Sequence, residues 1–186
     1  LLDTLRDAKE YGSILKVEGY NWELLRRFVS AADAGTQISL DSAGLEVTSE
    51  QLLTLIDITE TMGRKYDVVV TNPPYAGTAK LSDKLNEKVK LDYPNSKSDL
   101  STVCMERAIA MLKKHGYMTM INIPVWMFLS SYAKMREDIV NHNTLVNMLH
   151  CGRGIFGSDF GTTAFVIGKS FIDNYNGLYF RLFKSQ

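Results

Sequence analysis

One short segment constrains the fold more than any other: the run Asp67-Val68-Val69-Val70-Thr71, followed at once by Asn72-Pro73-Pro74-Tyr75. A β-branched run that is apolar on both faces is typical of a strand inside a parallel sheet. Two consecutive prolines fix φ twice and lack the backbone N–H groups that a sheet ladder needs, so the strand must end there. We therefore predict an interior strand over residues 67–71 with a stiff loop at its carboxyl end.

Downstream of this segment the pattern alternates between helix and strand. Lys113-Lys114-His115-Gly116 has the features of a helix C-terminus, because cations oppose the negative end of the dipole and a residue tolerant of positive φ follows. The sequence predicts a helix from about Asp99 to His115, a strand over Tyr117–Ile123 ended by Pro124, a helix over 130–141, a glycine-linked strand pair Leu145–His150 and Thr162–Ile167, and a last strand over Leu178–Phe183. This order predicts a doubly wound α/β sheet of parallel strands with a late antiparallel hairpin.

Upstream of residue 65 the sequence is mainly helical. We expect residues 35–48 to form a loop or a weak hairpin, and we divide the chain into a helical segment 1–64 and an α/β segment 65–186. Apolar residues at helical spacing predict three helices, marked by Leu1, Leu2, Leu5 and Ala8; by Trp22, Leu25, Phe28 and Val29 after an Asn21 cap; and by Leu52, Leu55, Ile56 and Met62 after a Thr48/Gln51 capping box.

Composition excludes several classes of protein. The 186 residues carry 21 Lys plus Arg and 21 Asp plus Glu, so the net charge offers no general argument for a nucleic-acid partner, and only local patches can decide that question. No stretch reaches the roughly 18 apolar residues of a membrane-spanning helix, and the start lacks the features of a secretory signal. We expect a cytoplasmic protein and, because the sequence begins with Leu1 rather than Met, a fragment of a longer one.

Cysteine and histidine spacing predicts no metal site. Cys104 and Cys151 lie far apart, match no metal or redox motif, and are interpreted as reduced thiols. The three histidines have no carboxylate or thiol partners at ligand spacing, and we assign them structural roles.

The loop over residues 72–75 carries the chemistry. Asn72 offers a side-chain amide oxygen, Pro73 a backbone carbonyl, and Tyr75 a flat aromatic face, on a backbone stiffened by Pro74. Two fixed acceptors that grip both hydrogens of a planar amine would free its lone pair and stabilise the positive charge that develops when it is alkylated. The alternative is a plain turn at a strand end. These residues alone leave the acceptor open between adenine N6, cytosine N4, an RNA base and a protein glutamine.

Longer segments narrow this choice by resemblance. Asp67–Tyr75 resembles motif IV of S-adenosylmethionine-dependent amino-methyltransferases. Segments along nearly the whole chain resemble the adenine-specific methyltransferases of BREX-type phage-defence systems, the PglX type; they are Leu1–Val17, Lys84–Leu100, Trp126–Ser131 and Gly152–Phe165. The resemblance implies a Rossmann-like methyltransferase sheet and methyl transfer from S-adenosylmethionine to a flipped adenine in double-stranded DNA, in restriction-modification or phage defence. Asn72, Pro73 and Tyr75 would then be the amine acceptors and the stacking residue.

One part of the family's pattern is missing. The family binds its cofactor at a glycine-rich motif I after an earlier strand, and no such motif precedes residue 66. The only G-x-G-x-x-G, at Gly152, Gly154 and Gly157, runs into the strand-like Thr162–Ile167 rather than into a helix, so we interpret it as a hairpin connection. We therefore expect the substrate half of a catalytic domain, with no assigned cofactor residues, weak or absent cofactor binding and no turnover by itself.

Candidate DNA contacts and partners follow from the same interpretation. Lys80, Lys84 and Lys97 follow the motif, among acidic residues, and form either a solvated mixed-charge surface or phosphate contacts. Phe156 and Phe160 either stack on an extruded base or plug the hairpin into the core. An unpaired edge strand would favour self-association, and other phage-defence subunits are further expected partners. A non-catalytic DNA-binding or partner-binding fragment is the alternative to an enzyme.

Overall fold

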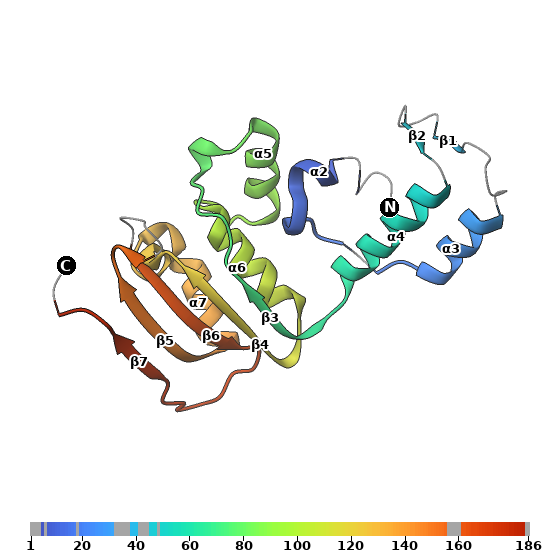
Figure 1. Cartoon of the computed structure of the whole chain (residues 1–186). Coiled ribbons are helices and arrows are strands. Elements are labelled where there is room, and N and C mark those ends of the chain that lie inside the picture. Colours follow the sequence, from blue (N-terminus) through green and yellow to red (C-terminus); the bar gives the residue numbers. More distant parts are fainter. Residues whose placement is uncertain are drawn as a thin grey trace. The chain divides into compact units, whose positions relative to one another are not determined.

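The structure is a computed structural model that describes residues 5, 7–17, 19–31, 38–40, 45–47, 49–155 and 161–184 (Figure 1). The chain divides into two compact units, Leu1–Arg64 and Lys65–Gln186. Each unit has a hydrophobic cluster of its own, so the two are described separately.

The first unit is mainly helical. Its elements are α2 (Ala8–Tyr11), η1 (Gly12–Ile14), α3 (Trp22–Ala31), β1 (Ile38–Leu40), β2 (Leu45–Val47) and α4 (Ser49–Gly63). The strands β1 and β2 pair antiparallel, so the segment that was expected to be a loop or a weak hairpin contains a hairpin. Leu1, Leu2 and the capping residue Thr48 lie outside the described residues.

Helix α3 begins where the sequence predicted. The Asn21 side-chain oxygen accepts a hydrogen bond from the backbone N–H of Leu24 at 2.9 Å, which satisfies one of the free donors of the first turn. Val29 packs with Leu52 and Ile56 of α4, whereas Phe28 is 72% exposed. Phe28, one of the residues that marked this helix in the sequence, falls outside the stripe that reaches α4, because adjacent helical positions are rotated by about 100°.

The second unit contains the sheet. Its elements are β3 (Tyr66–Thr71), η2 (Thr78–Lys80), α5 (Asp83–Asp92), α6 (Leu100–Met111), β4 (Leu112–Asn122), η3 (Pro124–Met127), η4 (Ser130–Tyr132), α7 (Ala133–His142), β5 (Thr144–Gly152), β6 (Thr162–Gly168) and β7 (Leu178–Arg181). The strand order is β3-β4-β6-β5-β7, with β6 antiparallel to both of its neighbours and the other pairings parallel. The predicted α/β sheet with a late antiparallel hairpin is confirmed.

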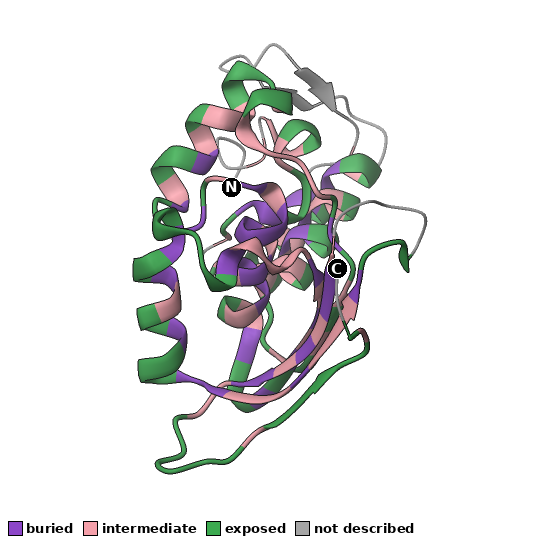
Figure 2. Ribbon diagram, turned by 90° about the vertical axis from the view of Figure 1, so that its left-hand side faces the viewer, coloured by how far each residue is buried: buried purple, intermediate pink, exposed green. Residues whose placement is uncertain are grey.

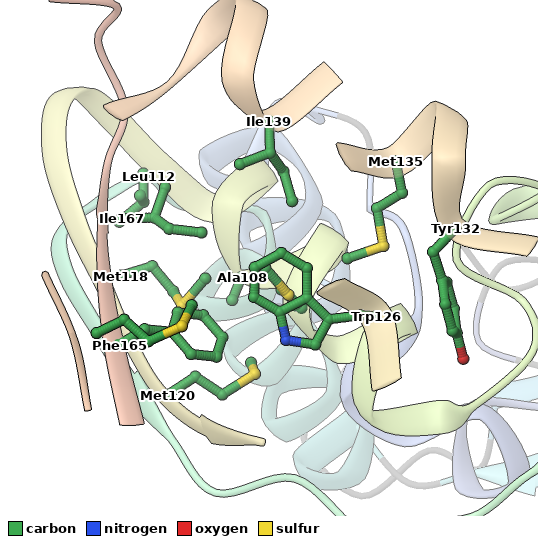
Figure 3. Packing of buried hydrophobic residues seen from close by; sticks show 12 residues of the cluster. Ala108, Leu112, Met118, Met120, Trp126, Tyr132, Met135, Ile139, Phe165 and Ile167 are labelled. Carbon is green, nitrogen blue, oxygen red and sulfur yellow. The ribbon is translucent and has the colours of Figure 1, made fainter. Parts of the chain in front are cut away.

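One face of this sheet is closely packed. Met118 and Met120 of β4 lie opposite Ile167 and Phe165 of β6, and all four side chains are at most 1% exposed. Helices α6 and α7 complete the cluster with residues that include Ala108, Met135 and Ile139 (Figure 3). Buried residues concentrate where these helices meet the sheet (Figure 2).

The opposite face is more open than the sequence predicted. Val68 is 56% exposed, Val70 is 73% exposed and Tyr117 beside them is 50% exposed. Strand β3 lies at the edge of the sheet, paired only with β4 among the described strands. The prediction of an interior strand buried on both faces was therefore wrong for this chain; residues of α6 and α7 belong to a single cluster, which lies on one face of the sheet.

The boundary between α6 and β4 also differs from the prediction. The helix ends at Met111, and residues 112–116, which were expected to end the helix, belong to β4. His115 has φ of 65°, and a Cβ at Gly116 would lie 2.9 Å from the carbonyl oxygen of Asp67. The run from Lys113 to Gly116 thus marks an irregularity in β4. At Gly116 the backbone of β3 approaches so closely that a side chain would not fit.

Candidate active site

The loop Asn72-Pro73-Pro74-Tyr75 leaves the carboxyl end of β3, beside the end of β4. Thr71, the last residue of β3, pairs with Met120. Asn72 and Pro74 are exposed, Pro73 is buried and Tyr75 is half-buried. Ligands of open α/β sheets bind beyond the carboxyl ends of the strands, so the most polar residue of the loop is presented to solvent where a substrate is expected.

Tyr75 links the loop to β4. Its hydroxyl donates to the Asn72 side-chain oxygen at 2.9 Å, and it also lies 3.2 Å from the carbonyl oxygen of Ile121 near the end of β4. Burial raises the pKa of Tyr75, so the hydroxyl keeps its proton at neutral pH and remains a donor. The sequence suggested only a stacking face for this residue; the hydrogen bond through its hydroxyl was not predicted.

The Asn72 amide keeps the capacity that its expected role requires. A carbonyl oxygen has two lone pairs, and the bond from Tyr75 occupies one of them. The bond also restricts the side-chain torsions, which holds the oxygen in place before any ligand arrives. An oriented acceptor on an exposed, proline-stiffened loop can therefore bind one N–H group of an amine.

A second segment, around Asp99, supports the loop from behind. The backbone N–H of Leu100 donates to the carbonyl of Ala76 at 2.9 Å, and Gly77 forms an antiparallel bridge with Asp99. The Asp99 carboxylate caps α6 by accepting from the backbone N–H of Ser101 at 2.8 Å and from its hydroxyl at 2.6 Å. Site support by Asp99 was missed at the sequence level, although an Asp before an apolar helical run is a recognisable N-cap signal.

The end of β4 is held just as closely. Asn122 is fully buried, and its side-chain oxygen accepts from the backbone N–H of Ile123 at 2.7 Å. The Thr163 hydroxyl of β6 donates to the Asn122 carbonyl at 3.1 Å. The carboxyl edge beside the loop is thus fixed across neighbouring strands, as a site that must position a reacting atom requires.

The predicted DNA-contact residues are only partly described. Lys80 ends η2, Lys84 lies in the first turn of α5 and Lys97 lies between α5 and α6; all three are exposed. Phe156 and Phe160 lie outside the described residues. Gly154, in the same connection, has φ of 77°. The strands that this connection joins, β5 and β6, pair antiparallel rather than leading into a helix.

The turns that follow the described strands of the sheet differ from the turn of a nucleotide-type cofactor site. None of the described strands of the sheet is followed by a glycine-rich turn that opens a helix, the arrangement that holds a nucleotide-type cofactor. The loop after β3 contains two prolines and that after β4 begins with Ile123 and Pro124, so neither offers a cradle of backbone N–H groups. What the described part of the chain does hold is a candidate acceptor for the substrate amine.

The cysteines and the helix lengths of the described residues can be compared with the predictions from the sequence. Cys104 and Cys151 are free thiols, and burial raises the pKa of Cys104 to about 11. None of the described helices is long and apolar enough to cross a membrane.

Comparison with known proteins identifies the family. By fold, the chain resembles the DNA-bound, ATP-dependent Type ISP restriction-modification enzyme LlaBIII, with a TM-score of 0.54 at 16% identity over 76% of this chain and 12% of that one. The Eco57I restriction-modification methylase family matches residues 21–156, and the chain belongs to this family.

Two curated relatives are closer in sequence. The chain is 34% identical over 179 residues to the adenine-specific methyltransferase BrxX of Escherichia coli O9:H4 (strain HS). It is 36% identical over 181 residues to the adenine-specific methyltransferase PglX of Lacticaseibacillus casei (strain Zhang). Each match covers 94% of this chain but 15% of the relative. The predicted resemblance to PglX-type methyltransferases is confirmed.

Proposed function

We propose that this chain is the substrate-binding part of a DNA adenine-N6 methyltransferase that acts in restriction-modification or phage defence. The observation that carries the proposal is the Asn72 side-chain oxygen, oriented by Tyr75 on an exposed loop at the carboxyl edge of the sheet. Membership of the Eco57I methylase family and the names of the two curated relatives support adenine as the acceptor.

In the proposed reaction the chain supplies acceptors rather than a charged base. The free lone pair of Asn72 and the carbonyl of Pro73 accept the two hydrogens of the adenine amine. They stabilise the positive charge that grows on nitrogen as it takes the methyl group, and this charge is lost when the methylated nitrogen releases one of its two protons to water. The aromatic face of Tyr75 stacks on the base, which has left the duplex to reach the loop. S-adenosylmethionine is the methyl donor of the complete enzyme in this proposal, and no residue of this chain is assigned to hold it.

The proposed partners follow from the same site. Double-stranded DNA with a flipped adenine is the substrate, and Lys80, Lys84 and Lys97 contact its phosphates, while Phe156 and Phe160 lie near the extruded base. We place the complete enzyme in the cytoplasm, where it would meet other phage-defence subunits. By itself the chain is expected to bind the cofactor weakly, to show no turnover, and to self-associate through the free edge of β3.

Substitution of Asn72 tests the proposal in the full-length protein that carries this sequence. Labelled methyl transfer from S-adenosylmethionine is measured to duplex DNA and, separately, to a protein acceptor. Asn72→Ala is expected to lower transfer to DNA at least ~10²-fold, since one acceptor of developing charge is lost. Asn141→Ala, an exposed asparagine in the last turn of α7, is the matched control and should retain activity.

Two results would contradict the proposal. Label found only in protein would exclude DNA as the substrate. Activity of the Asn72→Ala protein within about threefold of wild type would exclude the amide from charge stabilisation. DNA binding and the thermal midpoint, measured alongside, should be nearly unchanged, because Asn72 is exposed.

A further inference from the structure

The loop that follows β4 exposes three consecutive apolar side chains. Met127, Phe128 and Leu129 are 37%, 64% and 48% exposed. The aromatic residues on either side, Trp126 and Tyr132, are only 4% and 2% exposed. The loop is therefore anchored by a buried ring at each end, while its apolar tip faces solvent.

Hydrogen bonds make this tip rigid. Arg136 of α7 donates through Nη1 to the carbonyl of Trp126 at 2.8 Å and to that of Leu129 at 2.7 Å. The backbone N–H of Leu129 donates to the carbonyl of Val125 at 3.0 Å. The Trp126 ring packs on Phe165 of β6, with centroids 5.3 Å apart (Figure 3). The loop conformation is thus determined without the help of a bound partner.

Tyr132 connects the other end of the loop to the support of the candidate site. Burial raises the pKa of Tyr132, while the neighbouring side chains of Thr102 and Ser98 oppose that rise. Ser98 and Thr102 flank Asp99, which bridges to Gly77 beside the loop over residues 72–75. The loop after β4 and the candidate site therefore share one structural support.

The position of residues 127–129 and the polar residues beside them indicate which kind of partner this tip contacts. Strand β4 lies next to β3, and Tyr75 reaches the Ile121 carbonyl at 3.2 Å, so both loops leave the same edge of the sheet. Ser130, Ser131 and Lys134 next to the tip are exposed and offer hydroxyl groups and a cation. An apolar centre bordered by such groups complements stacked bases flanked by phosphates.

We propose that residues 127–131 are an interaction surface for duplex DNA, and that the Phe128 side chain enters the base stack where the target base is extruded. This inference rests on the proposed function. Extrusion leaves an apolar gap between neighbouring base pairs, and an aromatic ring that fills the gap recovers stacking contacts that the duplex has lost. Because Arg136 holds the loop, little ordering is needed when DNA binds.

The test compares two duplexes and three variants of the full-length protein carrying this sequence. One duplex has a paired target base and the other a mispaired one, and 2-aminopurine at the target reports extrusion. Phe128→Ala should weaken binding and extrusion by about tenfold on the paired duplex. On the mispaired duplex the loss should be below about threefold, because less unstacking is required.

Matched variants separate this role from a structural one. Phe128→Leu keeps apolar bulk and should restore most of the binding that Phe128→Ala loses. Phe171→Ala removes an equally exposed phenylalanine, 58% against 64%, beyond the other end of β6, and should leave both duplexes unaffected.

Three outcomes would overturn the inference. They are a Phe128→Ala protein that matches wild type on both duplexes, one that loses affinity equally for both, and one whose thermal midpoint falls with no DNA-dependent change. The last would mean that another segment of the full-length protein covers the tip. If wild type methylates no DNA at all, the proposed function fails instead, which is a distinguishable result.

Discussion

The two units of this chain differ in how many buried apolar residues stabilise each of them internally. Among the described residues, the cluster between α3 and α4 of the first unit has three buried members, Val29, Leu52 and Ile56, whereas twelve buried residues form the cluster under the sheet of the second. Precise positioning requires close packing, because a loosely packed element samples many conformations. The candidate site belongs to the second unit, whose larger buried cluster can hold an acceptor oxygen in a fixed position.

Ion pairs accompany the small cluster between α3 and α4 of the first unit. Arg26 of α3 pairs with Asp57 of α4 at 2.7 Å and also with Glu60, while Arg64 pairs with Glu60 at 3.0 Å. The hydrogen bonds with Arg26 and then Arg64 lower the pKa of Glu60. Such exposed pairs contribute little in water and are screened by salt, so the contact between α3 and α4 is the more easily loosened one.

The largest expected effect concerns the sheet. Phe165 is 1% exposed and contacts the Trp126 ring. Phe165→Ala should lower the free energy of unfolding of the second unit by about 3–5 kcal/mol, the usual range for a buried ring. Hydrogen exchange of β4 and β6 amides measures this loss. Unchanged protection there would contradict the assignment of the core to this unit.

A smaller loss is expected from the equivalent change in the first unit. Ile56 is 2% exposed but belongs to a cluster with three buried members among the described residues. Ile56→Ala should destabilise α3 and α4 by about 2–3 kcal/mol, since a sparse core can relax around the vacated volume. Exchange in β4 and β6 should not change. If all amides of both units become less protected together, the units unfold as one and the comparison fails.

The smallest effect is the response of the first unit to acid. Because the pKa of Glu60 is lowered in the folded chain, its contribution to stability is present above the unfolded value and is lost as pH falls through the folded value. Loosening of α4 should therefore begin below about pH 4.3, and added salt should weaken the effect.

Glu60→Gln provides the control for this pH effect. The substitution removes the titrating group, so exchange of α4 amides should depend less on pH in this range. The second unit has a similar exposed pair, in which Lys113 lowers the pKa of Asp67, but its larger core should hide the change. An equal pH dependence in wild type and Glu60→Gln would show that the Glu60 ion pairs do not cause the loosening of α4 in acid.

The sequence predicted the positions of most strands of the sheet, but it predicted less well how neighbouring elements pack around them. The positions of β3, β5, β6 and α7 follow from runs of β-branched residues, turn residues and helical spacing, which act over a few residues. The end of α6 was placed four residues too late, at His115 rather than Met111, because a cation-rich strand start next to Gly116 has the same local composition as a helix end. Only the approach of β3 to Gly116 distinguishes the two.

For the candidate site, local chemistry identified the loop but not its supports. Two prolines stiffen Asn72 and its neighbours wherever they occur, because the ring restricts φ irrespective of the fold. The Tyr75 hydroxyl that bonds Asn72 also lies close to the distant carbonyl of Ile121, and the bridge from Gly77 to Asp99 depends on how the chain returns after α5. No periodicity in the sequence encodes those pairings.

What the sequence by itself determined is therefore the rigid loop over residues 72–75, its place at a strand end, the α/β order and the family. These depend on covalent geometry and on patterns within a few residues. The tertiary structure alone decided that β3 is an edge strand with exposed valines, that Tyr75 orients Asn72, and that Phe128 stands on a pinned, solvent-facing loop. The edge position of β3 and the contact of Trp126 with Phe165 join segments tens of residues apart, and the Tyr75 hydroxyl, three residues from Asn72, lies close to the distant carbonyl of Ile121. The free energies of such contacts depend on packing that no local pattern specifies.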